Sequence, residues 1–222
     1  MLEAAIVVLI SEIMYNPASS EKHPVQTEWV ELYNPGDEAV ELGGWYLRDE
    51  DGQTGKVPKG TTLQPGEALV VIPDEQDVEE FRAAWGEKVQ VAKVTDWGPG
   101  GLSNLANSPG PDNEILTLRR PDDSVADEVN YDDGEPWPSD RPDGPSIYLR
   151  PEFLSAEAND KGHAWARSTV GQAGARAARA TDDYSRDDVG SPGHVETPPA
   201  AREAEPESDP EPDPEPDPEP ES

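Results

Sequence analysis

The chain contains no cysteine, and only three histidines, two methionines and two phenylalanines stand among its 222 residues. Without cysteine there is no disulfide framework and no thiolate chemistry to look for. Export from the cell is still allowed, because a domain of this length can be held together by its core alone. The sequence therefore argues against a small disulfide-stapled scaffold and leaves the compartment open.

Basic residues are also scarce, with 17 Lys and Arg against 48 Asp and Glu, for a net charge of −31. Residues 196–222 hold eleven acidic residues and only Arg202 on the basic side, so residues 1–195 carry −21 of the total. Such a charge repels polyanions, which excludes nucleic acid and disfavours anionic membrane surfaces. Basic proteins and cations are compatible partners.

Long hydrophobic runs are missing as well. The most apolar stretch, Met1–Ile10, carries Glu3, lacks a basic beginning and is too short to cross a bilayer. No signal peptide is visible in it and no membrane insertion is expected. We interpret it as the start of a first strand, from about Ala5 to Tyr15.

Proline and acid alternate from Glu205 to Ser222. Proline at every second position blocks both helix and sheet hydrogen bonds, and the like charges repel each other. The sequence therefore predicts two parts, a folded domain over residues 1–195 and a disordered acidic tail or linker over residues 196–222.

Short alternating segments separated by turn residues fill the folded part. The clearest strand is predicted over Thr27–Asn34, where Trp29 and Tyr33 share one face with Glu31, while Val30 and Leu32 share the other. Further strands are predicted over these segments: 38–47, 68–72, 114–118, 125–131 and 146–149. This spacing is typical of an all-β sandwich rather than an α/β fold.

One short surface helix interrupts the strands. Val78, Phe81 and Trp85 recur at helical spacing, Asp74 is the expected N-cap and Gly86 the expected stop. Residues 166–188 are rich in Ala, Arg and Asp without a clear period. We interpret them as a long loop with a helical turn near residues 173–180.

Several strings along the chain are more specific than this pattern. They are ISEIMYNP (10–17), EWVELYN (28–34), VELGGWYL (40–47), LQPGE (63–67), GLSN (101–104), DEVNY (127–131), GPSIYL (144–149) and GSPG (190–193). In this order the chain resembles the lamin tail domain family, in particular its bacterial and archaeal members. The resemblance implies an immunoglobulin-like antiparallel β-sandwich without catalysis, often found in exported proteins. No coiled-coil rod accompanies it, so a filament-forming role is not supported.

Catalytic patterns are not seen in the sequence. The histidines His23, His163 and His194 lie far apart, and neither a His-Glu-x-x-His nor a Gly-x-Ser-x-Gly motif occurs. No residue is nominated as a nucleophile with its base. We therefore predict that the domain is not an enzyme and needs no cofactor.

Two kinds of candidate binding residue stand out. Asp49 and Asp51 begin a segment like a calcium loop, but Gly60 stands where the closing Glu is needed, so ordinary turn chemistry is the alternative. Trp97 and Trp137 lie in loops rich in Gly and Pro, where an exposed ring could stack on a sugar or on a partner's side chain. Their alternative role is to cover the open end of the core.

The resulting hypothesis is a non-catalytic binding or structural module, outside the cell or on its surface, whose partner is a protein or a cell-surface component. The alternative is an accessory module for calcium or a polysaccharide, attached to a secreted hydrolase. The sequence indicates no oligomeric state.

Overall fold

The computed structural model describes residues 8–19, 26–102, 105 and 114–198. Of the tail predicted over residues 196–222, residues 199–222 lie outside the described residues. The division into two parts therefore stays a prediction. Within these ranges no helix is long and apolar enough to cross a membrane.

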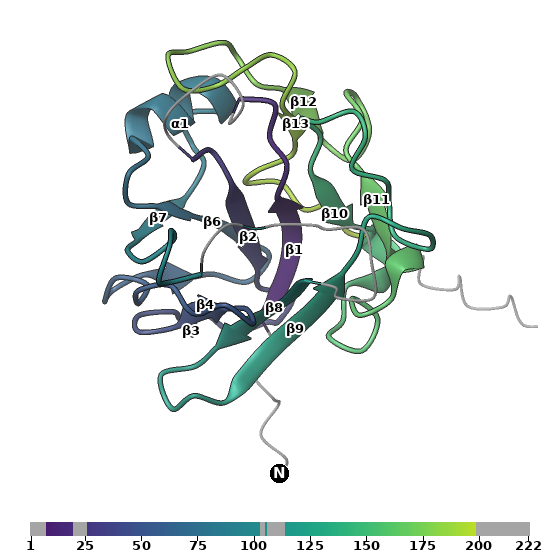
Figure 1. Ribbon diagram of the computed structural model, residues 1–222. Coiled ribbons are helices and arrows are strands. Elements are labelled where there is room, and N and C mark those ends of the chain that lie inside the picture. The colour runs from purple at the N-terminus through teal and green to yellow at the C-terminus, as the bar shows by residue number, and fades with distance from the viewer. Residues whose placement is uncertain (1–7, 20–25, 103–104, 106–113, 199–222) are drawn as a thin grey trace, which may run out of the picture.

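A six-stranded sheet forms the centre of the molecule, in the order β11-β10-β1-β2-β6-β7 (Figure 1). Its strands are β1 Leu9–Met14, β2 Trp29–Tyr33, β6 Ala68–Pro73, β7 Val91–Val94, β10 Ile147–Leu149 and β11 Trp165–Arg167. All neighbours are antiparallel except β6 and β7, which run parallel. The parallel pair departs from the expected antiparallel pattern because the helix α1, Val78–Trp85, makes the crossover between the two strands.

The second sheet has three strands in the order β4-β8-β9: β4 Tyr46–Arg48, β8 Glu114–Arg119 and β9 Val125–Tyr131. Two-stranded ribbons pair β3 Val40–Glu41 with β5 Thr62–Leu63, and β12 Arg176–Ala177 with β13 Val189–Gly190. Short 3-10 helices cover Pro151–Phe153 and Gly162–Ala164. The all-β, immunoglobulin-like sandwich with one short helix is thereby confirmed.

The six-stranded sheet is covered on both faces. Val30 and Leu32 of β2 pack into the core shared with the three-stranded sheet, as their alternation predicted. Trp29 of the same strand packs on the other face, with Phe81 and Trp85 of α1. Figure 1 shows α1 and the β12–β13 ribbon above the six-stranded sheet, and β8 and β9 below it.

A β-bulge at Ser11 decides which β1 side chains face which layer. The pairing of β1 with β2 shifts between Ile10 and Glu12, so Ser11 is the extra residue. Ile10 and Ile13 consequently both point into the core between the sheets, although three positions separate them. Glu12 is turned to the opposite face, opposite Glu31 of β2.

The helix α1 begins later than predicted. Its N-cap is Asp77, whose side chain accepts hydrogen bonds from the backbone N–H groups of Glu79 and Glu80, rather than Asp74. Gly86 ends it, as expected, with φ of 134°, a conformation that favours glycine. Phe81, Ala84 and Trp85 are its buried residues.

Residues 166–188 also differ from expectation. No helical turn occurs over residues 173–180; this stretch contains β12, which pairs with β13. Tyr184 from the same segment packs edge-on against Phe81 and Trp85, with ring centroids 5.8 and 6.3 Å apart. This aromatic contact and the ribbon hold the segment in place. Neither of them produces a hydrophobic periodicity that could be recognised in the sequence.

Asp127 of β9 joins the two sheets. One of its carboxylate oxygens accepts hydrogen bonds of 2.7 Å from the backbone N–H of Ile10 and from the side-chain amide of Asn159. Asp127→Ala is expected to lower the free energy of unfolding by about 2–4 kcal/mol, because both donors are left buried and unpaired. Asp127→Asn keeps an acceptor oxygen for both donors and should therefore cost less than Asp127→Ala. Urea unfolding of both variants checks this; equal midpoints for Ala and wild type would contradict the inter-sheet role.

Candidate functional site

The loop tryptophans of the sequence hypothesis lie in the core. Trp97 is 3 % exposed and donates a hydrogen bond of 3.1 Å from its indole nitrogen to the Glu28 carboxylate. Trp137 is 9 % exposed and packs against Trp165 with ring centroids 6.1 Å apart. Neither ring is exposed enough to stack on a sugar, and both positions match the alternative role of covering the core.

The loop that holds Asp49 and Asp51 lies beside the loop that follows Trp97, since a Cβ on Gly52 would come within 2.1 Å of the Gly101 carbonyl oxygen. One oxygen of Asp49 accepts the backbone N–H groups of Asp51 and Gly52, which is ordinary turn chemistry. Burial and the neighbouring charges raise the pKa of Asp49 to about 6. Within the described ranges no three His, Asp or Glu residues are arranged to hold a metal ion. Calcium binding therefore stays a prediction from the sequence alone.

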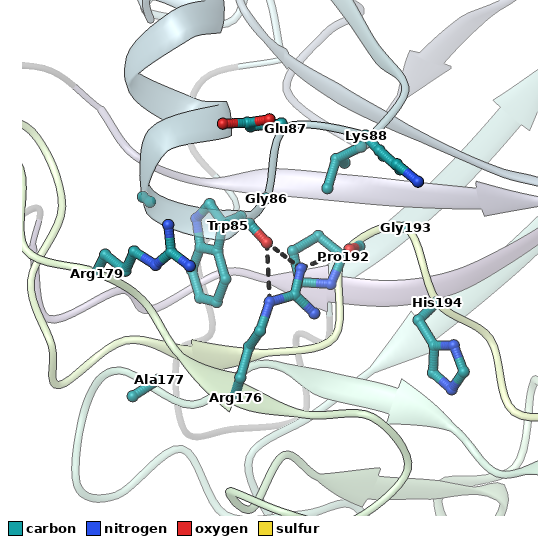
Figure 2. A pocket seen from close by; sticks show the side chains of 12 residues that line it. Trp85, Gly86, Glu87, Lys88, Arg176, Ala177, Arg179, Pro192, Gly193 and His194 are labelled. Carbon is teal, nitrogen blue, oxygen red and sulfur yellow. Dashed lines mark hydrogen bonds between the residues drawn. The ribbon is translucent and has the colours of Figure 1, made fainter.

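A cavity lies instead where the C-terminal end of α1 meets the β12–β13 ribbon (Figure 2). Its volume is about 430 Å³, which is within the usual range for sites that take a small ligand. We call it the α1–β12 cavity. Its lining comes from three segments that are distant in sequence: Ala84 to Val89, Arg176 to Arg179 without Ala178, and Pro192 to His194.

Packing of α1 shapes the inner side of this cavity. Trp85 is 1 % exposed and meets Trp29 edge-on, with ring centroids 5.9 Å apart. The rings of Phe81 and Tyr184 complete the cluster. These contacts fix the last turn of α1 and so the position of Gly86, Lys88 and the other residues that follow.

Arg176 connects the ribbon to the helix. Its Nε donates a hydrogen bond of 2.8 Å to the Trp85 carbonyl oxygen, and its Nη2 donates one of 3.1 Å to the Pro192 carbonyl oxygen. Figure 2 shows the guanidinium held between these two backbone groups. Burial lowers the pKa of Arg176, and the carboxyls of Glu12 and Glu31 act in the opposite direction. Arg176 therefore both closes the α1 C-terminus and lies close to a buried acidic pair.

That pair, Glu12 and Glu31, lies on the outer face of the six-stranded sheet, where the two residues are cross-strand neighbours. Each side chain is 1 % exposed. Burial raises the pKa of both carboxyls, and for Glu31 the charge of Glu12 adds to the effect, giving a pKa of about 8. Two carboxyls this close cannot both ionise without a large cost, so the pair holds a proton at neutral pH.

Donors from the later part of the chain surround the acidic pair. Glu12 accepts hydrogen bonds from the backbone N–H and the hydroxyl of Ser191, at 2.9 and 2.8 Å, and from the hydroxyl of Ser146. Glu31 accepts the N–H of Gly193 at 2.6 Å and the hydroxyl of Ser11 at 2.9 Å. The segment 192–194, which forms one wall of the cavity, is thus fixed to the sheet by two buried carboxyls, which bind Ser191 and Gly193.

Sequence reasoning missed this cavity. Lys88, Arg176 and Arg179 belong to no motif, and they meet only because the helix crossover and the β12–β13 ribbon lie on the same face of the sheet. His194, which also lines the cavity, was noted only as an isolated histidine. The one available signal was the GSPG string at 190–193, whose Pro192 and Gly193 line the cavity.

Comparison with known proteins identifies one family. A family model described as Lamin Tail Domain matches residues 3–133, which is more than half of the chain. No curated protein matches the chain. The matched range ends just after β9, so β10 to β13 lie beyond it.

Proposed function

The chain belongs to the lamin tail domain family, a family of non-catalytic immunoglobulin-like domains, and from this premise we propose that it is an interaction module outside the cell or on its surface. The extracellular location rests on the resemblance to family members found in exported proteins. The binding role rests on one observation, the α1–β12 cavity. It is a concave site on a sandwich whose six tryptophans are all buried.

The charge of the cavity supports a protein partner. The chain carries −31 overall, yet the cavity has three basic residues and a single acidic one, Glu87. A local positive site on a negative protein selects its partner by charge and discourages non-specific association elsewhere on the surface. The partner we propose is a protein of the cell surface that presents a negative group to this cavity.

Binding of the labelled full-length chain to intact cells of the source organism tests the proposal. Saturable binding is expected, and Lys88→Glu with Arg179→Glu should weaken it at least about fivefold. The matched control reverses the same number of charges at exposed positions outside the cavity, with Lys59→Glu and Arg186→Glu, and should bind as the wild type does. No saturable binding to intact cells, or equal loss in the control, would contradict the proposal.

A further inference from the structure

Among the residues that the structure describes, no ion pair neutralises the basic residues of the α1–β12 cavity. Arg176 uses its guanidinium on two backbone carbonyl oxygens, which carry no formal charge. Lys88 and Arg179 are exposed, and neither forms a salt bridge within the part of the chain that the structure describes. The carboxyls of Glu12 and Glu31 act on Arg176 through their charge, but they form hydrogen bonds with Ser191 and Gly193 and do not line the cavity. The cavity therefore presents a net positive charge.

Apart from Glu87 and His194, the remaining lining is apolar. Ala84, Trp85 and Val89 contribute from the helix side, and Ala177 and Pro192 from the ribbon side. Figure 2 shows Arg179 on one side of Arg176, and Lys88 and His194 on the other. A ligand that satisfies both features has one anionic group and an apolar body next to it.

The charge of the whole chain limits what kind of anion can approach. An extended polyanion would also lie against the surface outside the cavity, and the excess of 48 acidic over 17 basic residues in the chain would repel it there. A ligand with a single negative charge at its tip avoids this repulsion. The carboxyl end of a peptide has this character, because the side chain of the last residue lies next to the terminal carboxylate and can be apolar.

We propose that the α1–β12 cavity binds the carboxyl-terminal residue of a peptide, with the carboxylate between Lys88, Arg176 and Arg179 and an apolar last side chain against Val89 and Pro192. This inference rests on the proposed function and names the ligand class of the same cavity. The segment 192–194 serves as the wall that Glu12 and Glu31 hold in place through Ser191 and Gly193. Lys88 and Arg179 supply positive charge that forms no salt bridge elsewhere in the described ranges.

Calorimetric titration of the full-length chain tests this assignment with two matched peptides. The first is acetyl-GSGVL with a free carboxyl end, and the second is the same peptide with a carboxamide end. We expect the acid to bind with a dissociation constant below about 1 mM and the amide at least about tenfold more weakly. Lys88→Gln with Arg179→Gln should weaken binding of the acid by a similar factor, whereas Lys59→Gln with Arg186→Gln should leave it unchanged.

Three results would overturn the assignment. They are equal binding of acid and amide, equal binding by the cavity variant and the control variant, and binding of inorganic sulfate as tight as that of the peptide. Melting temperatures of both variants within a few degrees of the wild type show that the fold is intact. The chain could bind to intact cells, lose this binding in the variant with Lys88→Glu and Arg179→Glu, and yet not bind the peptide acid. In that case the proposed function stands and this inference fails.

Discussion

A chain that ends after Asp133, where the family match stops, is expected not to fold. The reason lies in the sheet order, because β10 pairs directly with β1 and β11 continues the sheet beyond it. Ile147, Leu149 and Trp165 from these strands are core residues. Each contributes about 1.5–3 kcal/mol through burial, and the usual stability of a whole domain is only about 5–15 kcal/mol.

The same truncation removes the donors to Glu12. Ser146, Ser168 and Ser191 all follow residue 133, and each donates to this buried carboxyl. These hydrogen bonds hold the later segments on β1, and each contributes about 1 kcal/mol that the truncated chain loses. Far-ultraviolet circular dichroism and urea unfolding measure the outcome.

The matched control for this truncation is a chain that ends after Pro198. It keeps every described strand, so it should unfold cooperatively with the same midpoint as the full chain. This comparison also tests the predicted boundary near residue 195. A cooperative transition for residues 1–133 would contradict the claim that β10 and β11 are integral to the domain.

The second large effect is a loss of stability as the pH rises from about 5 to about 8. Burial raises the pKa of Glu28 to about 7, and of Glu31 and Glu114 to about 8, from an ordinary value of 4.5. The native state therefore holds protons that the unfolded chain has already released. The contribution of these groups to the free energy of unfolding is fully present below about pH 4.5. It falls as the pH rises through the folded pKa values of about 7 and 8, by about 1.4 kcal/mol per pH unit for each proton.

Glu31→Gln isolates one proton of this effect. A Gln oxygen can accept the N–H of Gly193 and its amide can donate to the Ser11 hydroxyl, which can rotate to accept. The variant should match the wild type near pH 5 and exceed it at pH 8, with a slope that is smaller by about 1.4 kcal/mol per pH unit. Melting temperatures between pH 4.5 and 8.5 at constant salt give the slopes.

The control for this prediction is Glu38→Gln, which removes a negative charge at an exposed position. It should leave the pH slope as in the wild type, and so separates burial from net-charge repulsion. A Glu31→Gln slope that equals the wild-type slope would mean that Glu31 is ionised in the folded protein at neutral pH.

The sequence was sufficient for the fold and insufficient for the cavity, and β2 illustrates both. Its alternation correctly placed Val30 and Leu32 on one face and Trp29 with Glu31 on the other. Alternation cannot tell which face is exposed, and here both are covered, because α1 and residues 176–194 pack over the face of Trp29. Glu31 is therefore a buried acid, although its residue type suggests an exposed one.

The bulge at Ser11 and the loop tryptophans show two further limits. A single extra residue changes the face of the sheet to which the β1 side chains after Ser11 point. Nothing in the string LISEIM marks the position of this residue. Trp97 and Trp137 lie in Gly- and Pro-rich segments that indicate a loop correctly, but a loop can lie over the end of a core as well as extend into solvent. Only the packing of segments distant in sequence decides between these cases.

The most direct test of the central claim, that the face formed by α1 and residues 176–194 is the binding surface, is a nitrogen-15 NMR titration of the full-length chain with the acetyl-GSGVL acid. We predict shifts of the backbone amides of Trp85, Gly86, Ala177 and Gly193, and none in β4, β8 and β9. Shifts confined to those three strands, or a spectrum that does not change at saturating peptide, would contradict the account.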